Sequence, residues 1–133
     1  MPHGSATRHE RQDEGLPAAR RLRATGLFAE AYAQDRCSRG RYLLLWTRRG
    51  AGAALRVGVV TSRKVGNAVQ RAKARRRLRE VFRRHRAGLQ GEVDLVFVAR
   101  ASLVKATWAD VVSDFLQVVD KAGLRKVTAE SKI

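Results

Sequence analysis

The stretch that decides the fold runs over residues 67–88 and reads NAVQRAKARRRLREVFRRHRAG. Asn67 and Gln70 have the spacing of a capping box, with Asn in place of Ser or Thr, and Gly88 suits a C-terminal stop. We therefore predict a helix from Asn67 to about Ala87 that is anchored to a core by one face. The anchoring residues recur three or four positions apart on a stripe about 100° wide: Ala74, Leu78, Val81 and Phe82.

The rest of this helix is basic. Residues 63–86 hold eleven Lys or Arg and one acid, so they carry 11 − 1 = +10 of a total charge of 28 − 12 = +16. Arg75, Arg79 and Arg83 form a like-charge ladder, which costs a few tenths of a kcal/mol per pair. Such a concentration of charge opposes compaction, so a polyanion is the natural partner. Nucleic acid fits best, because the stretch lacks the broad, aromatic-rich apolar face that an acidic membrane surface would need.

Outward from this helix, strand patterns occupy residues 41–48, 55–62 and 93–100. A short helical pattern starts at Thr25 and has apolar residues on one face up to Tyr32, a second runs over residues 107–123, and residues 35–40 are expected to form a turn. The order helix, strand, strand, helix, strand, helix predicts an α/β (α+β) layer structure. Its sheet should have three or four strands and be covered mainly on one face.

Length and composition predict one domain, because 133 residues with 44% hydrophobic residues can bury one core. We expect a flexible polar tail over residues 1–17, a single RNA-binding domain over 18–123 and a basic tail over 124–133. No apolar run reaches the length of a membrane span, and no secretory signal is visible. Cys37 is the single cysteine, which excludes an internal disulfide and a cysteine-clustered zinc site and fits the cytoplasm.

Three aromatic residues have two possible roles. Phe28 and Tyr32 share a helical face, and Trp46 lies on the strand pattern of residues 41–48. Core packing accounts for most aromatic residues in proteins. Aromatic rings beside a basic surface would instead form a stacking platform for unpaired bases.

No catalytic or metal-binding set is visible in this chain. His3 and His9 fall in the N-terminal tail, and His85 lies on the core stripe of the basic helix. The acids after Arg86 show neither paired carboxylates at metal-ligand spacing nor a Ser/His/Asp arrangement. We therefore expect binding, with any chemistry supplied by a partner.

One segment has a recognisable pattern. Residues 56–58 read RVG, and residues 62–82 read SRKVGNAVQRAKARRRLREVF. This segment resembles the signature of the bacterial ribonuclease P protein component, and the resemblance extends over about residues 22–123. It implies a two-layer sandwich of about four mixed strands and three helices, similar to the second domain of ribosomal protein S5. It also implies a left-handed β-α-β crossover, against the usual hand.

The resemblance further implies a function. The family's protein binds a catalytic RNA and the single-stranded 5′ leader of precursor tRNA, and it assists Mg²⁺-dependent endonucleolytic 5′ maturation. The RNA and its Mg²⁺ ions carry out the hydrolysis, and no obligate protein partner is implied. By this resemblance Phe28, Tyr32 and Trp46 line the leader cleft. The RNA-contact positions are Arg63, Lys64, Asn67, Arg71, Lys73, Arg75, Arg76 and Arg79.

The sequence departs from the family pattern in two places. Where the family pattern has an Arg-Asn-Arg triplet, this chain has Arg71-Ala72-Lys73, so an amide and a guanidinium fork are absent. Arg77 adds a charge where the family usually has an apolar residue. The alternative is a ribosomal or architectural RNA-binding protein without a processing role. A double-stranded DNA reader is disfavoured because residues 71–86 contain no Asn or Gln to read base edges.

Overall fold

A computed structural model describes residues 21–22 and 25–126, and it contains a four-stranded mixed sheet in the order β1-β2-β4-β3. β1–β2 and β2–β4 are antiparallel, whereas β3 and β4 are parallel, with Val57 opposite Leu95. The strands are β1 (Cys37–Arg39), β2 (Leu43–Arg48), β3 (Val57–Val60) and β4 (Asp94–Ala99).

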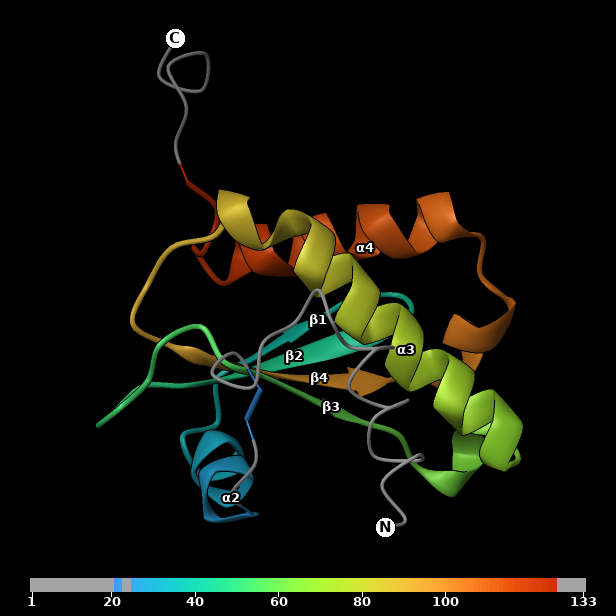
Figure 1. Cartoon of the computed structure of the whole chain (residues 1–133), viewed down its shortest axis with the longest axis horizontal. Coiled ribbons are helices and arrows are strands. Elements are labelled where there is room, and N and C mark those ends of the chain that lie inside the picture. The colour runs from blue at the N-terminus through green and yellow to red at the C-terminus, as the bar shows by residue number, and fades with distance from the viewer. Residues whose placement is uncertain (1–20, 23–24, 127–133) are drawn as a thin grey trace, which may run out of the picture.

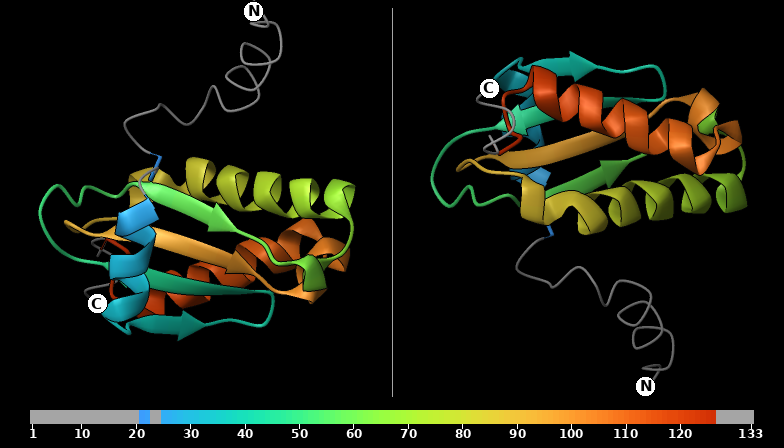
Figure 2. Two further views of the ribbon diagram at one scale, coloured as in Figure 1. Left: turned by 90° about the horizontal axis from the view of Figure 1, so that it is seen from below. Right: turned by 90° about the horizontal axis from the view of Figure 1, so that it is seen from above.

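Two long helices cover one face of this sheet (Figure 1). These are α3 (Ala68–His85) and α4 (Trp108–Lys121), while α2 (Thr25–Ala33) lies against part of the opposite face (Figure 2). The path from β3 through α3 to the parallel neighbour β4 is left-handed, as the right-hand view of Figure 2 shows. The two-layer sandwich with its left-handed crossover is confirmed. Within the described residues, three short 3-10 turns connect these elements: η2 (Arg63–Val65), η3 (Arg86–Gly88) and η4 (Ala101–Lys105).

The helix starts follow local side-chain chemistry. The Asn67 side chain accepts a hydrogen bond from the Gln70 N–H, and the Gln70 side chain accepts one from the Asn67 N–H. This capping box confirms the predicted start of α3. Thr107 caps α4 in the same way by accepting from the Asp110 N–H.

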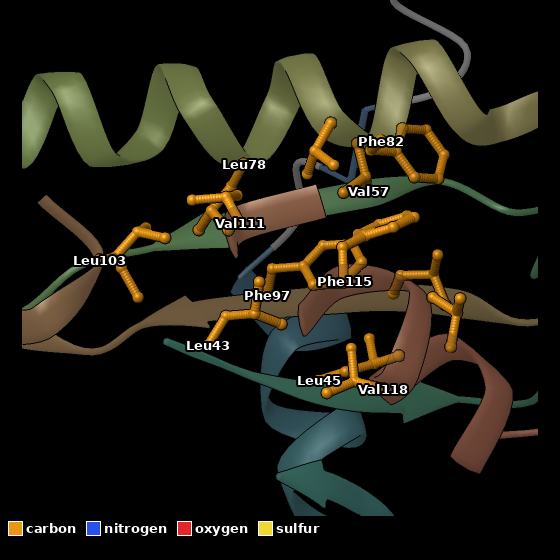
Figure 3. Packing of buried hydrophobic residues seen from close by; sticks show 14 of the residues in the cluster. Leu43, Leu45, Val57, Leu78, Phe82, Phe97, Leu103, Val111, Phe115 and Val118 are labelled. Atoms are coloured by element: carbon orange, nitrogen blue, oxygen red, sulfur yellow. The ribbon is translucent and has the colours of Figure 1, made fainter. Parts of the chain in front are cut away.

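The sheet separates two apolar clusters. The main core lies between the sheet and the α3–α4 layer, where Phe97 packs 5.5 Å from Phe115 and 6.5 Å from Phe82 between ring centroids (Figure 3). The predicted stripe of α3 is buried in this core. A smaller cluster under α2 contains Leu22, Ala31 and Val96, with the half-buried residues Leu27, Phe28, Trp46, Val60 and Val98 packed against it.

Two predictions of element boundaries are wrong. Part of the expected turn over residues 35–40 is the short edge strand β1, whose Cys37 lies opposite Trp46. Folded structure also extends past Gly123 into the expected C-terminal tail, because Leu124 is 1% exposed and the Lys126 N–H donates to the Gly88 carbonyl. The expected tail over residues 1–17 lies outside the described residues. In the part of the chain that is described, none of the helices has the length and apolarity to cross a membrane.

Candidate nucleic-acid interface

The connection from β3 into α3 is a tightly bonded loop. The Ser62 hydroxyl accepts from the Lys64 N–H, and the Arg71 guanidinium donates to the Gly66 carbonyl at 3.1 Å. Gly66 has φ of 141°, and a Cβ atom there would collide with the Gln70 side chain of the capping box. Only glycine therefore fits this position. The loop leaves the side chains of Arg63 and Lys64 exposed beside the N-terminus of α3, where the free N–H groups and helix dipole favour an anion.

The predicted RNA-contact residues all lie on this loop and on α3, and we call them the basic face. Arg71, Arg75 and Arg79 are half-buried at helical spacing, and Arg75 donates to the Thr61 hydroxyl at 2.9 Å just after β3. Lys73 is half-buried and Arg76 is exposed. The side-chain amide oxygen of Asn67 already accepts the capping hydrogen bond from the Gln70 N–H. The structure thus brings all eight residues onto one continuous segment: Arg63, Lys64, Asn67, Arg71, Lys73, Arg75, Arg76 and Arg79.

The like-charge ladder is compensated at its C-terminal end, contrary to the sequence prediction. Glu80 accepts from Arg83 at 2.6 Å and from Arg84 at 2.8 Å. The hydrogen bond from Arg83 is the main cause that lowers the pKa of Glu80 to about 2. Arg77 also has a structural role, since its guanidinium donates to the carbonyls of Leu103 and Ala106 and so holds η4 against α3.

The three aromatic residues lie together on the opposite side of the sheet. The rings of Tyr32 and Trp46 meet edge to face, with centroids 5.3 Å apart and planes at 85°. Tyr32 is 40% exposed, whereas Phe28 and Trp46 are half-buried. Partial burial raises the pKa of the Tyr32 hydroxyl. We call these residues the aromatic cluster; none of them is sealed in the interior.

A hollow of about 320 Å³ joins the aromatic cluster to the basic face. Phe28 and Arg79 both line it, together with Arg21 and Leu22 from the segment before α2. Gly58 of β3 lies directly under the Phe28 ring, and a Cβ atom at this position would overlap the ring. The glycine of the RVG motif therefore allows an aromatic ring to lie flush against the edge of the sheet.

Sequence reasoning missed two features of this region. Val69 is 77% exposed in the first turn of α3, although the sequence indicates only that it lies off the core stripe. The second feature is the attachment of α2. The buried Arg48 donates to Glu30 and to Asp94, both at 2.8 Å, while Gln34 exchanges two hydrogen bonds with the backbone of Arg49.

Asp94 is the centre of this attachment. Burial raises its pKa, but hydrogen bonds from Arg56, the Ala54 N–H and Arg48 outweigh burial and hold the pKa below 3.8. The other acid that is buried among the described residues, Asp114, accepts from the backbone N–H groups of residues 41–43. These carboxylates stabilise the fold.

His85 also has a structural environment, as predicted from its position on the core stripe. Its Nδ1 lies 2.9 Å from the Val81 carbonyl oxygen, and its ring centroid lies 5.6 Å from that of Phe115. Among residues 21–22 and 25–126, no three His, Cys, Asp or Glu side chains are grouped so that they could hold a metal ion.

The sequence matches the Ribonuclease P family over residues 16–123. It is 34% identical over 129 residues to the ribonuclease P protein component of Thermus thermophilus, covering 91% of this chain and 76% of that one. It is 29% identical over 104 residues to the corresponding protein of Syntrophomonas wolfei, covering 78% and 87%.

Solved structures agree with these matches. The RNase P protein of Thermotoga maritima superposes with a TM-score of 0.68 at 26% identity, over 76% of this chain and 96% of that one. The Staphylococcus aureus protein gives a TM-score of 0.71 at 24% identity, over 80% and 98%, and supports the fold.

Proposed function

The chain belongs to the ribonuclease P protein family and is the protein subunit of that ribonucleoprotein enzyme, and from this premise we propose how its surfaces divide the work. The basic face binds the catalytic RNA. The aromatic cluster, on the other side of the sheet, binds the unpaired 5′ leader of precursor tRNA. The RNA carries out the hydrolysis, and the protein positions the substrate in the cytoplasm without an obligate protein partner.

Charge and rigidity of the basic face support the first assignment. The loop over residues 62–66 and the first turn of α3 are fixed by the capping box and by the bond from Arg71 to Gly66. Backbone N–H groups and cationic side chains held in this way suit phosphate oxygens. The exposed Val69 in the same turn adds an apolar surface for a ribose or base edge.

Exposure of the aromatic cluster supports the second assignment. Stacking on an aromatic ring contributes about 1–3 kcal/mol per base without regard to base identity, which suits leaders of differing sequence. The hollow between Phe28 and Arg79 offers a ring for a base and a guanidinium for its phosphate. A leader strand that crosses this hollow would run from the aromatic cluster toward the basic face, where the catalytic RNA is bound.

We assign the Mg²⁺ ions to the RNA and the substrate. The two buried carboxylates, Asp94 and Asp114, are engaged by arginines and by backbone N–H groups and are not available as ligands. Within the proposal, the protein lowers the Mg²⁺ requirement indirectly, because cationic side chains screen phosphate repulsion and a held leader fixes the substrate.

Reconstitution tests the proposal directly. The chain is combined with the catalytic RNA and a precursor tRNA at low Mg²⁺, where RNA alone is slow, and 5′ cleavage is measured. We expect strong stimulation by the protein, and weaker stimulation by a Lys73→Glu, Arg76→Glu variant. Arg41→Glu, in the connection between β1 and β2 and outside the basic face, serves as a control for the reversal of one positive charge. Absence of stimulation by the wild-type protein would contradict the processing role.

A further inference from the structure

A second hollow, of about 410 Å³, lies at the C-terminal end of α3 and belongs neither to the basic face nor to the aromatic cluster. We call it the terminal pocket. Leu89 and Leu116 give it an apolar lining. Its polar lining comes from Arg84, His85, Arg125 and Lys126.

Backbone hydrogen bonds fix the walls of the terminal pocket. The Gln90 N–H donates to the Leu124 carbonyl and the Lys126 N–H donates to the Gly88 carbonyl, both at 2.8 Å. These bonds join the turn after α3 to the segment after α4, and the buried side chain of Leu124 anchors that segment in the main core. The pocket therefore exists before any ligand binds.

The orientation of His85 is also fixed. The Val81 carbonyl oxygen can only accept, so Nδ1 of His85 donates to it at 2.9 Å. Nε2 is then the acceptor of the neutral ring and becomes a donor when the ring is protonated. The ring packs on Phe115 and forms one wall of the pocket.

Positive charge dominates the pocket. Arg84 pairs with Glu80 and lies 5.3 Å from the Trp108 ring centroid, and Arg125 pairs with Asp120 at 2.9 Å. The side chains of these pairs are 33–55% exposed, so solvent weakens the pairing and the arginines can exchange partners at little cost. Among the residues that the structure describes, no salt bridge includes Lys126. An apolar lining beside three cationic side chains suits a nucleotide, whose phosphate binds the cations and whose base or ribose covers the leucines.

The position of the terminal pocket indicates which RNA it contacts. It lies at the end of α3 opposite the loop of Arg63 and Lys64, which at 1.5 Å per residue over 18 residues is a separation of about 27 Å. Its lining comes from α3, α4 and the segments that follow them, whereas the aromatic cluster packs with the residues under α2. Figure 2 shows that α3 and α4 cover one face of the sheet and α2 lies against the other. We propose that the terminal pocket binds a nucleotide of the catalytic RNA and is a second anchor for the partner bound by the basic face. This inference rests on the proposed function.

Affinity for the catalytic RNA tests the second anchor. An Arg125→Glu, Lys126→Glu variant is compared with the wild type over a series of salt concentrations. We expect at least a tenfold loss of affinity and a slope of log affinity against log salt that is shallower by about one unit, because one or two phosphate contacts are lost. Arg41→Glu, in the connection between β1 and β2 and not among the residues that line the terminal pocket, is expected to change affinity by less than threefold.

Three outcomes would overturn the inference. Unchanged affinity and slope in the double variant would show that the pocket does not bind the RNA; the proposed function would stand if Lys73→Glu, Arg76→Glu still weakened binding. A loss that Arg41→Glu reproduces would show an effect of net charge alone. If the double variant binds precursor tRNA more weakly but binds the catalytic RNA as the wild type does, the occupant of the pocket is the substrate.

A direct probe separates the pocket from general electrostatics. The ring proton resonances of His85 are followed by NMR during titration with adenosine 5′-monophosphate, inorganic phosphate and adenosine. We expect the largest saturable shift with the nucleotide, because only it matches both linings, and loss of that shift in Lys126→Glu. Equal shifts with inorganic phosphate, or a shift that survives Lys126→Glu, would contradict a nucleotide site.

Discussion

Trp46 has a second neighbour besides the core: its ring meets the 40% exposed ring of Tyr32 edge to face. A half-buried aromatic residue can stabilise the fold and offer its remaining surface to a base. The sequence left these two roles open, and the structure shows a ring that packs against the cluster under α2 and stays partly exposed. Arg48 and Asp94 have a purely internal role, since both are buried and bonded to each other.

Replacing Trp46 separates the two roles. We expect Trp46→Ala to weaken binding of precursor tRNA by about 1–3 kcal/mol, which is the value of one stacked base, and to leave binding of mature tRNA unchanged. The measurement is the dissociation constant of the reconstituted holoenzyme for both RNAs. Leu44→Ala, also half-buried on β2, is the control for lost packing. Equal losses for both RNAs would assign Trp46 to the core alone.

Asp94 gives a prediction of pH dependence. Its pKa is below 3.8 in the folded protein, so the folded state binds this proton less tightly than the unfolded state. The stabilisation is therefore complete above the unfolded pKa and is lost as pH falls through the lower folded pKa. We expect Asp94→Asn to cost about 3 kcal/mol at pH 7, because Arg48 and Arg56 lose their shared partner.

Urea denaturation at several pH values measures this effect. The difference in unfolding free energy between wild type and Asp94→Asn should shrink as pH falls into the acidic range in which this carboxylate becomes protonated. Asp120→Asn removes the exposed pair with Arg125 and should cost only about 0–1 kcal/mol. A difference that stays constant down to pH 2 would mean that packing, and not ionisation, is what the carboxylate contributes.

At the scale of elements, periodicity predicted those parts whose burial is repetitive. The stripe of α3 recurs at helical spacing from Ala74 to Phe82 and β4 alternates between the two clusters, so both were predicted from the sequence. β1 has three residues and no apolar alternation, and its existence depends on pairing with β2. The attachment of α2 through Arg48, Glu30 and Gln34 spans 15 to 18 positions in the chain, and no local pattern encodes such a contact.

This attachment of α2 predicts control over leader binding. Glu30 and Gln34 hold the helix that carries Phe28 and Tyr32, so a Glu30→Gln, Gln34→Ala variant should loosen the aromatic cluster. We expect about a threefold to tenfold weaker affinity for precursor tRNA and unchanged affinity for the catalytic RNA. Titration of both RNAs measures the two effects. A parallel loss for both RNAs would indicate general destabilisation, which thermal unfolding of the same variant would register.

At the scale of the whole molecule, charge is distributed unevenly over the fold. Ten of the sixteen net charges lie within residues 63–86. The buried carboxylates of Asp94 and Asp114 are engaged in hydrogen bonds within the fold. The helix layer therefore carries strong self-repulsion in the free protein, and a bound RNA relieves it. Charge that destabilises the free protein is the same charge that drives binding.

Salt concentration should therefore act with opposite signs on folding and on binding. Between about 50 and 500 mM salt we expect the Tm of the free protein to rise, because screening weakens repulsion along α3. Over the same range, affinity for the catalytic RNA should fall with a log–log slope near −4 if the basic face neutralises about six phosphates of unpaired strand. Thermal unfolding and RNA titration in matched buffers measure both. Lys73→Glu, Arg76→Glu should flatten both dependences, since it removes charge from the repelling and binding surface alike. A Tm that falls with salt while the binding slope stays steep would show that the cations are already neutralised within the free protein.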